Sequence, residues 1–85
     1  LYKKGDILMT LSTSGNSKNI LKILDYTSSK KIFSVGLLGN KGGKAKKYCS
    51  EGIIVPSENV ARIQEAHIFL GHYIFEQVEN LLLKK

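Results

Sequence analysis

The chain has 85 residues, of which 42% are hydrophobic and 24% charged, and its formal net charge is +6. This is the composition of an ordinary globular domain rather than of a disordered chain, and no apolar run approaches the roughly 18 residues of a membrane-spanning helix. Because Arg62 is the only arginine, and nucleic-acid sites gather arginine and aromatic side chains, we expect the lysines to form solvated surface. We therefore expect neither a nucleic-acid nor a membrane partner.

Apolar periodicity and turn residues predict six elements along the chain. They are a strand at about 7–11, a helix at about 17–28, a strand at about 32–38, a short helix at about 44–49, a strand at about 53–55 and a helix at about 58–83 capped by Ser57. This order indicates right-handed crossovers and a parallel sheet with helices on both faces. The fold class is therefore α/β, a three-layer sandwich. Three strands are few for it, so we expect part of a longer domain.

The last predicted helix is apolar over most of its circumference, from Ile63 to Leu83. A helix of this kind usually has two neighbours, and we expect one of them to be another subunit.

A segment rich in hydroxyl groups, residues 12–17, separates the first strand from the first helix. Its hydroxyls belong to Ser12, Thr13, Ser14 and Ser17. The start of a helix offers unpaired N–H groups and the positive end of the macrodipole, which favour a phosphate, and Gly15 lets the backbone approach a ligand closely. An ordinary serine-rich turn with a helix N-cap accounts for the same residues equally well. In parallel sheets, however, ligands bind beyond the carboxyl ends of the strands, where this segment falls.

Both histidines, His67 and His72, lie on the last predicted helix close behind Gln64 and Glu65. Histidine can ligate zinc or move protons near neutral pH, and glutamine can hydrogen-bond a sugar hydroxyl. On a mostly apolar helix, however, a histidine is more often a packed, hydrogen-bonded residue. Gln64 and His72 are separated by about 12 Å along the helix axis and by an angle of about 80°. One metal ion can bind both side chains only if they lean toward a shared point. Otherwise Gln64 and His72 belong to different sites or act in different subunits.

Together these features resemble the sugar isomerase (SIS) domain family and, within it, the bacterial phosphoheptose isomerases. The resemblance rests on residues 12–17, on Gly42-Gly43, on Val55-Pro56-Ser57 and on the run Ala61–Glu65 followed by the two histidines. It covers the whole chain, so residues 1–85 are expected to be the C-terminal portion of a single SIS domain with its flavodoxin-like fold.

The resemblance implies a cytoplasmic homotetramer that converts sedoheptulose 7-phosphate into D-glycero-D-manno-heptose 7-phosphate, a step toward the heptose of lipopolysaccharide or capsule. It implies substrate contacts from Ser12, Thr13, Ser14, Ser17 and Gln64. It further implies a zinc ion held by Gln64 and His72, with His72 as the catalytic acid/base. In the family, the N-terminal half adds a histidine and a glutamate to the zinc site, so we expect the 85 residues alone to be inactive. We expect structural roles for Glu65 and His67 and no nucleophilic role for Cys49.

Two alternatives remain open at the level of sequence. Non-catalytic SIS proteins that associate with the bacterial replication initiator share the hydroxyl segment and the arginine–isoleucine–glutamine–glutamate run, but they lack a histidine at the position of His72, which favours the enzyme. A regulatory domain that senses phosphosugars is the other alternative, and such proteins usually carry a DNA-binding segment upstream.

Overall fold

The computed structural model describes residues 5–83, so the predicted surface lysines at positions 3, 4, 84 and 85 lie outside the described part. The elements are β1 (Ile7–Ser12), α1 (Lys18–Ser29), β2 (Phe33–Gly39), the 3-10 helix η1 (Lys44–Lys47), β3 (Glu51–Val55) and α2 (Val60–Leu83). All six predicted elements are therefore present, with bounds that differ by a few residues. The lysines at positions 30, 31, 46 and 47 are exposed, as expected.

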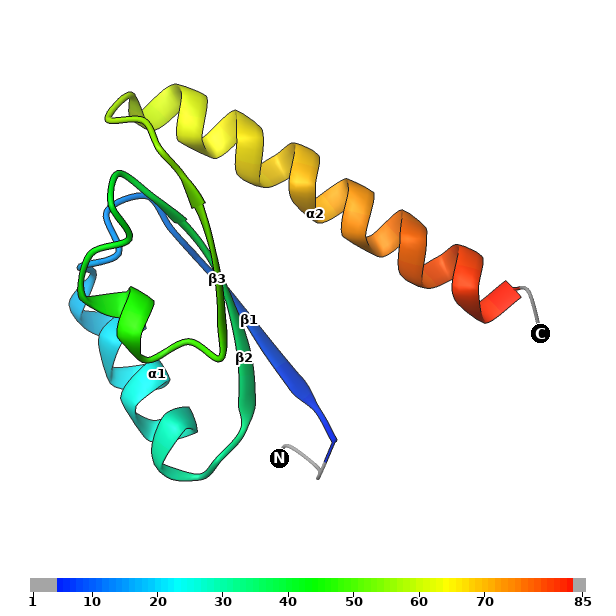
Figure 1. The fold of residues 1–85 in the computed structure, drawn as a ribbon, viewed down its shortest axis with the longest axis horizontal. Helices are drawn as coiled ribbons and strands as arrows, with labels where there is room; N and C mark the ends of the chain where they lie inside the picture. Colours follow the sequence, from blue (N-terminus) through cyan, green and yellow to red (C-terminus); the bar gives the residue numbers. More distant parts are fainter. Residues whose placement is uncertain (1–4, 84–85) are drawn as a thin grey trace.

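The three strands form one parallel sheet in the order β1-β2-β3. In register, Thr10 pairs with Gly36, and Gly36 with Gly52. Helix α1 and η1 lie on one side of the sheet and α2 lies on the other (Figure 1). The predicted α/β fold with a parallel sheet between helical layers is therefore confirmed.

The core lies on both sides of β2, because successive strand residues point to opposite faces. Leu38 is fully buried in a cluster with Leu24 of α1 and Ala45 of η1. Leu37 is fully buried as well. On the other face of β2, a Cβ on Gly39 would lie 2.6 Å from the side chain of Ile63 in α2. The missing side chain at Gly39 therefore lets α2 approach β2 closely.

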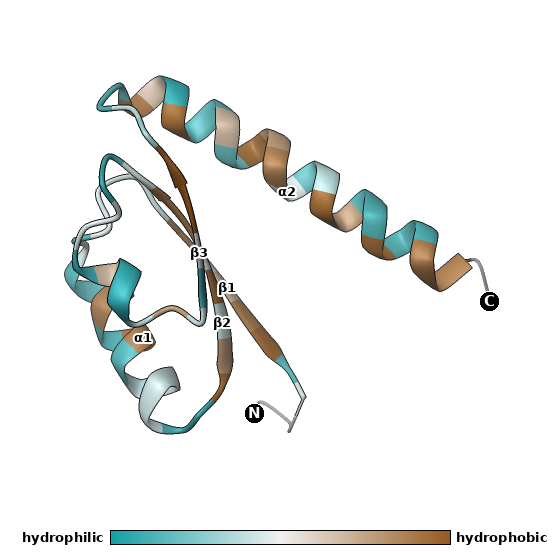
Figure 2. Ribbon diagram, viewed as in Figure 1, coloured by the Kyte–Doolittle hydropathy of each residue, from teal (hydrophilic) through white to brown (hydrophobic). Residues whose placement is uncertain are grey.

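Helix α2 leaves the sheet after its first turns and extends beyond it (Figure 1). Of its side chains only those of Ile63 and His67 are buried. Most apolar residues farther along are exposed, 67% for Phe69 and 76% for Leu83, and Figure 2 shows hydrophobic positions to the end of the described helix. No described helix is long and apolar enough to cross a bilayer. A single copy of the chain therefore leaves most of this apolar helix in water.

The start of α2 differs from the prediction, because Asn59 rather than Ser57 caps it. The Asn59 side-chain Oδ1 accepts a hydrogen bond from the N–H of Arg62 at 3.3 Å, and the Ser57 hydroxyl accepts one from the N–H of Asn59 at 3.0 Å. The Ser57 hydroxyl therefore supports the turn before the helix. In the first turns, Arg62 pairs with Glu65 at 2.9 Å on the exposed surface.

The end of α1 is formed without a glycine. Lys31 has a φ of 58°, and its N–H donates to the Ser28 carbonyl while the N–H of Ile32 donates to that of Thr27. These two bonds are those of a Schellman motif, in which the residue with left-handed dihedrals is usually glycine.

Replacing Lys31 with glycine is expected to stabilise the protein by about 0.5–1 kcal/mol, because glycine adopts a positive φ without the steric cost of a Cβ. Urea unfolding of the two proteins measures the difference. The matched control is Lys30→Gly, at the neighbouring position with a φ of −92°, where glycine brings no relief and adds freedom to the unfolded chain. Equal effects of the two substitutions would contradict the prediction.

Candidate functional site

The hydroxyl segment forms the turn from β1 into α1, as the sequence predicts. The buried Ser12 hydroxyl accepts a hydrogen bond from the N–H of Gly15 at 3.0 Å, and the exposed Ser14 hydroxyl accepts one from Asn16 at 3.0 Å. Ser17 occupies the N-cap position of α1, but its hydroxyl makes no cap hydrogen bond. Helix capping therefore does not account for Ser17, and its hydroxyl is available to a ligand.

The segment is held in place by the turn after β2. Gly15 has a φ of 71°, and a Cβ on it would overlap the carbonyl oxygen of Gly42. The Gly15 carbonyl accepts a hydrogen bond from Ala45 at 2.8 Å, and the Asn16 side chain accepts one from the N–H of Lys44 at 2.9 Å. The need for glycine at position 15 thus arises from the contact between two turns, whereas the sequence suggested a close approach to a ligand.

Beside the hydroxyl segment, a hollow of about 540 Å³ opens between β1, α1 and α2. Its lining is formed by Leu11, Ser12, Thr13, Ser14, Ser17, Ile20, Gln64, His67 and Ile68. All five residues predicted to contact substrate therefore meet at one place, although Gln64 is some fifty positions away in the sequence. The apolar members and His67 were not predicted as lining residues, because only the packing of α2 on the sheet brings His67 and Ile68 there.

His72 lies apart from this group. It is exposed and is not among the residues that line the hollow. It follows the buried Ile63 by nine positions, which turns it by about 180° on the helix, so it faces away from the sheet of its own chain. The structure therefore brings Gln64, but not His72, to the hydroxyl segment.

The predicted zinc ion can be tested against the residues that would hold it. Within residues 5–83, no group of three or more histidine, cysteine, aspartate or glutamate side chains is placed to bind a metal. Zinc sites in proteins use three or four such ligands, whereas Gln64 and His72 are about 12 Å apart along the helix axis. The described residues alone do not fit a zinc site.

His67 is 3% exposed, and its Nε2 lies 2.8 Å from the carbonyl oxygen of Leu38. This agrees with the expected structural role. Cys49 is half-buried, and burial raises the pKa of its thiol. Because the thiolate is the nucleophilic form, this shift disfavours a nucleophilic role at neutral pH.

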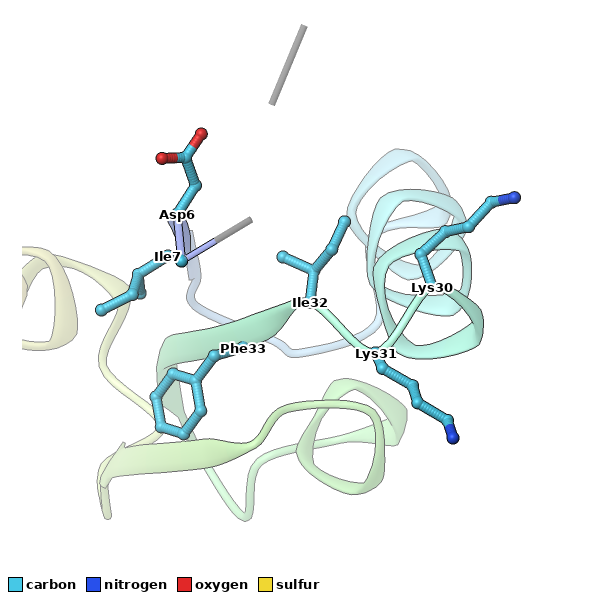
Figure 3. Close-up of a pocket in the computed structure, with 7 residues that line it drawn as sticks. Asp6, Ile7, Lys30, Lys31, Ile32 and Phe33 are labelled. Atoms are coloured by element: carbon cyan, nitrogen blue, oxygen red, sulfur yellow. The ribbon is translucent and has the colours of Figure 1, made fainter. Parts of the chain in front are cut away.

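A larger hollow, of about 900 Å³, lies at the opposite end of the sheet, between the starts of β1 and β2. Figure 3 shows the side chains of Lys30 and Lys31 extending outward, away from Asp6. None of the predicted site residues lines this hollow, and ligands of parallel sheets bind at the carboxyl ends of the strands instead. The smaller hollow is therefore the candidate site.

No protein-family model matches the chain. It is 51% identical over 82 residues to phosphoheptose isomerase 2 of Campylobacter jejuni and 46% identical over 80 residues to the phosphoheptose isomerase of Clostridium acetobutylicum. These alignments cover 96% and 94% of this chain but 41% of each relative. The chain thus spans about two fifths of the length of the curated relatives it matches.

A solved structure of phosphoheptose isomerase from Neisseria gonorrhoeae matches this fold with a TM-score of 0.82. The two chains are 34% identical, and the match covers 87% of this chain and 42% of that one. The resemblance to the phosphoheptose isomerases of the sugar isomerase family is confirmed by these relatives.

Proposed function

We propose that the protein containing this chain is an aldose–ketose isomerase that acts on a sugar phosphate, and that the hollow beside the hydroxyl segment holds the substrate. The observation that carries the proposal is the meeting of Ser12, Thr13, Ser14, Ser17 and Gln64 around one hollow. The similarity to phosphoheptose isomerases over 96% of the chain supports the same reaction class.

The chemistry of the hollow suits a phosphorylated sugar. Hydroxyl groups donate to phosphate oxygens, and the first N–H groups of α1, with the positive end of its macrodipole, favour negative charge. Ser14 already accepts a hydrogen bond through its oxygen, so its proton is free to be donated outward. The Gln64 amide can both donate to and accept from sugar hydroxyls. The apolar side chains of Leu11, Ile20 and Ile68 supply the remaining wall.

Isomerisation moves one proton from the carbon next to the carbonyl to the carbonyl carbon itself. It moves a second proton between the oxygen atoms on these two carbons. In our proposal His72 is the acid/base group that moves such a proton. Since His72 does not line the hollow of its own chain, it acts in our proposal at a site that another part of the assembly completes. Zinc binding by Gln64 and His72 remains a prediction from the resemblance, with further ligands from outside residues 5–83.

The more specific proposal is the conversion of sedoheptulose 7-phosphate into D-glycero-D-manno-heptose 7-phosphate for lipopolysaccharide or capsule, by a cytoplasmic homotetramer. Self-association is supported by the exposed apolar side chains of α2, among them Phe69, Phe75 and Leu82, because surfaces of this kind commonly mark protein interfaces.

A second candidate function, sugar-phosphate binding without turnover, is favoured by the position of His72 outside the hollow. The two functions share the binding site and differ in whether the bound sugar is converted. Incubation with sedoheptulose 7-phosphate followed by analysis of the sugar products distinguishes them.

The binding site itself is tested by the double variant Ser14→Ala/Ser17→Ala. Hydrogen bonds to a charged group contribute about 1.5–3 kcal/mol each, so affinity for sedoheptulose 7-phosphate, measured by calorimetry, is expected to fall by at least about 100-fold. Ser28→Ala, at the exposed far end of α1, is the control and should bind normally. Unchanged affinity in a folded double variant would contradict the proposed site.

A further inference from the structure

The carboxyl end of β2 makes hydrogen bonds to the hydroxyl segment, to the turn before α2 and to α2 itself. The Leu38 carbonyl lies 2.8 Å from the ring Nε2 of His67 in α2. The Asn40 side chain donates to the carbonyl of Thr13 in the hydroxyl segment at 3.1 Å, and the Asn40 N–H donates to the carbonyl of Ser57, before α2, at 3.0 Å. The end of one strand therefore sets where the hydroxyl segment and α2 lie relative to each other.

The contact between His67 and Leu38 is directional. A carbonyl oxygen only accepts hydrogen bonds, so the Nε2 of His67 carries the hydrogen and donates it. His67 is 3% exposed and Leu38 fully buried, so water cannot readily replace either partner, and a side chain without the N–H would leave the Leu38 carbonyl without this bond. The bond therefore favours this rotation of α2 on the sheet over rotations that would break it.

The direction of the Gln64 side chain depends on that rotation of α2. Ile63 and His67, one turn apart, are the two buried residues of α2, and Gln64 is turned from them by about 100° and 60° around the helix axis. In this orientation Gln64 lines the hollow together with Thr13 and Ser14. The apolar contact of Ile63 with Gly39 is not directional, so it restricts this rotation less sharply than a hydrogen bond does.

We propose that His67 is a positioning residue of the sugar-phosphate site, whose hydrogen bond to the Leu38 carbonyl holds Gln64 opposite the hydroxyl segment. This role goes beyond the packing of a buried histidine, and it rests on the proposed function for its effect on substrate. His67 acts through the orientation of α2 and needs no change of its own protonation.

The test compares His67→Leu, which removes the donor, with His67→Gln, which keeps an N–H donor. The matched control is Ile63→Val, which trims the neighbouring buried contact on the same face of α2. The first measurement is the NMR chemical shift of the Gln64 side-chain amide and of the backbone amides of residues 13–17, without ligand. The second is the affinity for sedoheptulose 7-phosphate, with KM and kcat where turnover occurs.

His67→Leu is expected to shift the resonances of the Gln64 side-chain amide and of residues 13–17. It should also weaken the affinity for sedoheptulose 7-phosphate, and raise KM, roughly tenfold, which is the effect of one misplaced hydrogen bond. His67→Gln should restore part of the affinity, and Ile63→Val should leave affinity within about twofold. Unchanged resonances in folded His67→Leu, or equal losses of affinity in His67→Leu and Ile63→Val, would overturn the proposal. If the unsubstituted protein binds no sugar phosphate, the proposed function fails, and the resonances still decide whether His67 positions Gln64.

Discussion

Replacing His72 with alanine is expected to lower kcat for isomerisation by at least about 100-fold, because a positioned acid/base group typically contributes 10²–10⁴-fold. The affinity for sedoheptulose 7-phosphate should change little, since His72 does not line the hollow that is formed by Gln64 and the hydroxyl segment. Because His72 is exposed, the substitution should also leave the fold intact. Steady-state kinetics on the full protein, together with calorimetric binding, separate the two effects.

The matched control is Glu79→Ala, which lies two turns farther along the same face of α2 and is also exposed. It removes a titratable side chain without touching the proposed chemistry and should keep normal kcat. Turnover by His72→Ala at the unsubstituted rate would remove His72 from the mechanism. Retained sugar-phosphate binding with no turnover even in the unsubstituted protein would favour the non-catalytic function instead.

The position of His72 bears on how an active site could be assembled. Gln64 lines the hollow of its own chain, whereas His72, about two turns farther along α2, is exposed and does not line it. Association of two copies through α2 would give a route by which His72 of one copy reaches a ligand held by the other. The exposed apolar side chains around His72, such as Ile68, Phe69 and Phe75, would be covered in the same assembly.

Much of the fold could be predicted because local signals agree with the global pattern. Short apolar runs and helical apolar periodicity, bounded by turn residues, give all six elements, and their order gives a parallel sheet. The helix ends were harder. Ser57 and Asn59 are both good capping residues, and the turn after Pro56 decides that Asn59 is the cap. The end of α1 had no glycine to mark it, because Lys31 adopts the left-handed conformation itself.

For the candidate site, the five polar residues predicted to contact substrate line one hollow, whereas the predicted His72 does not line it and the lining residues His67 and Ile68 were not predicted. Hydroxyls at the start of a helix and a glutamine in a recognisable run are visible in the sequence alone. That His67 and Ile68 share the same hollow depends on how far α2 is rotated on β2, which is a tertiary property. The contact of Gly15 with Gly42 likewise joins two turns that are distant in sequence, so no local signal could indicate it.

Replacing Gly15 with alanine is expected to destabilise the protein by about 2–5 kcal/mol. The left-handed conformation at a φ of 71° costs a residue with a Cβ about 1–2 kcal/mol, and forcing an extra methyl group into a packed region costs typically 1–3 kcal/mol. The neighbour that the Cβ would meet is the backbone carbonyl of Gly42, which cannot turn aside as a flexible side chain could. The total is a large part of the 5–15 kcal/mol that stabilises a typical domain.

Gly71→Ala is the matched control, because a Cβ on Gly71 would meet nothing within 4 Å and the residue lies inside α2. There, alanine should stabilise the helix by about 0.5–1 kcal/mol, so the same substitution should act with opposite sign at the two glycines. Urea or thermal unfolding measures both. A Gly15→Ala protein that still folds should also bind sugar phosphate more weakly, because Ser14 is next to the displaced residue and Ser17 is two positions beyond it. A Gly15→Ala protein as stable as Gly71→Ala would mean that the turn at residues 42–43 does not hold the hydroxyl segment in place.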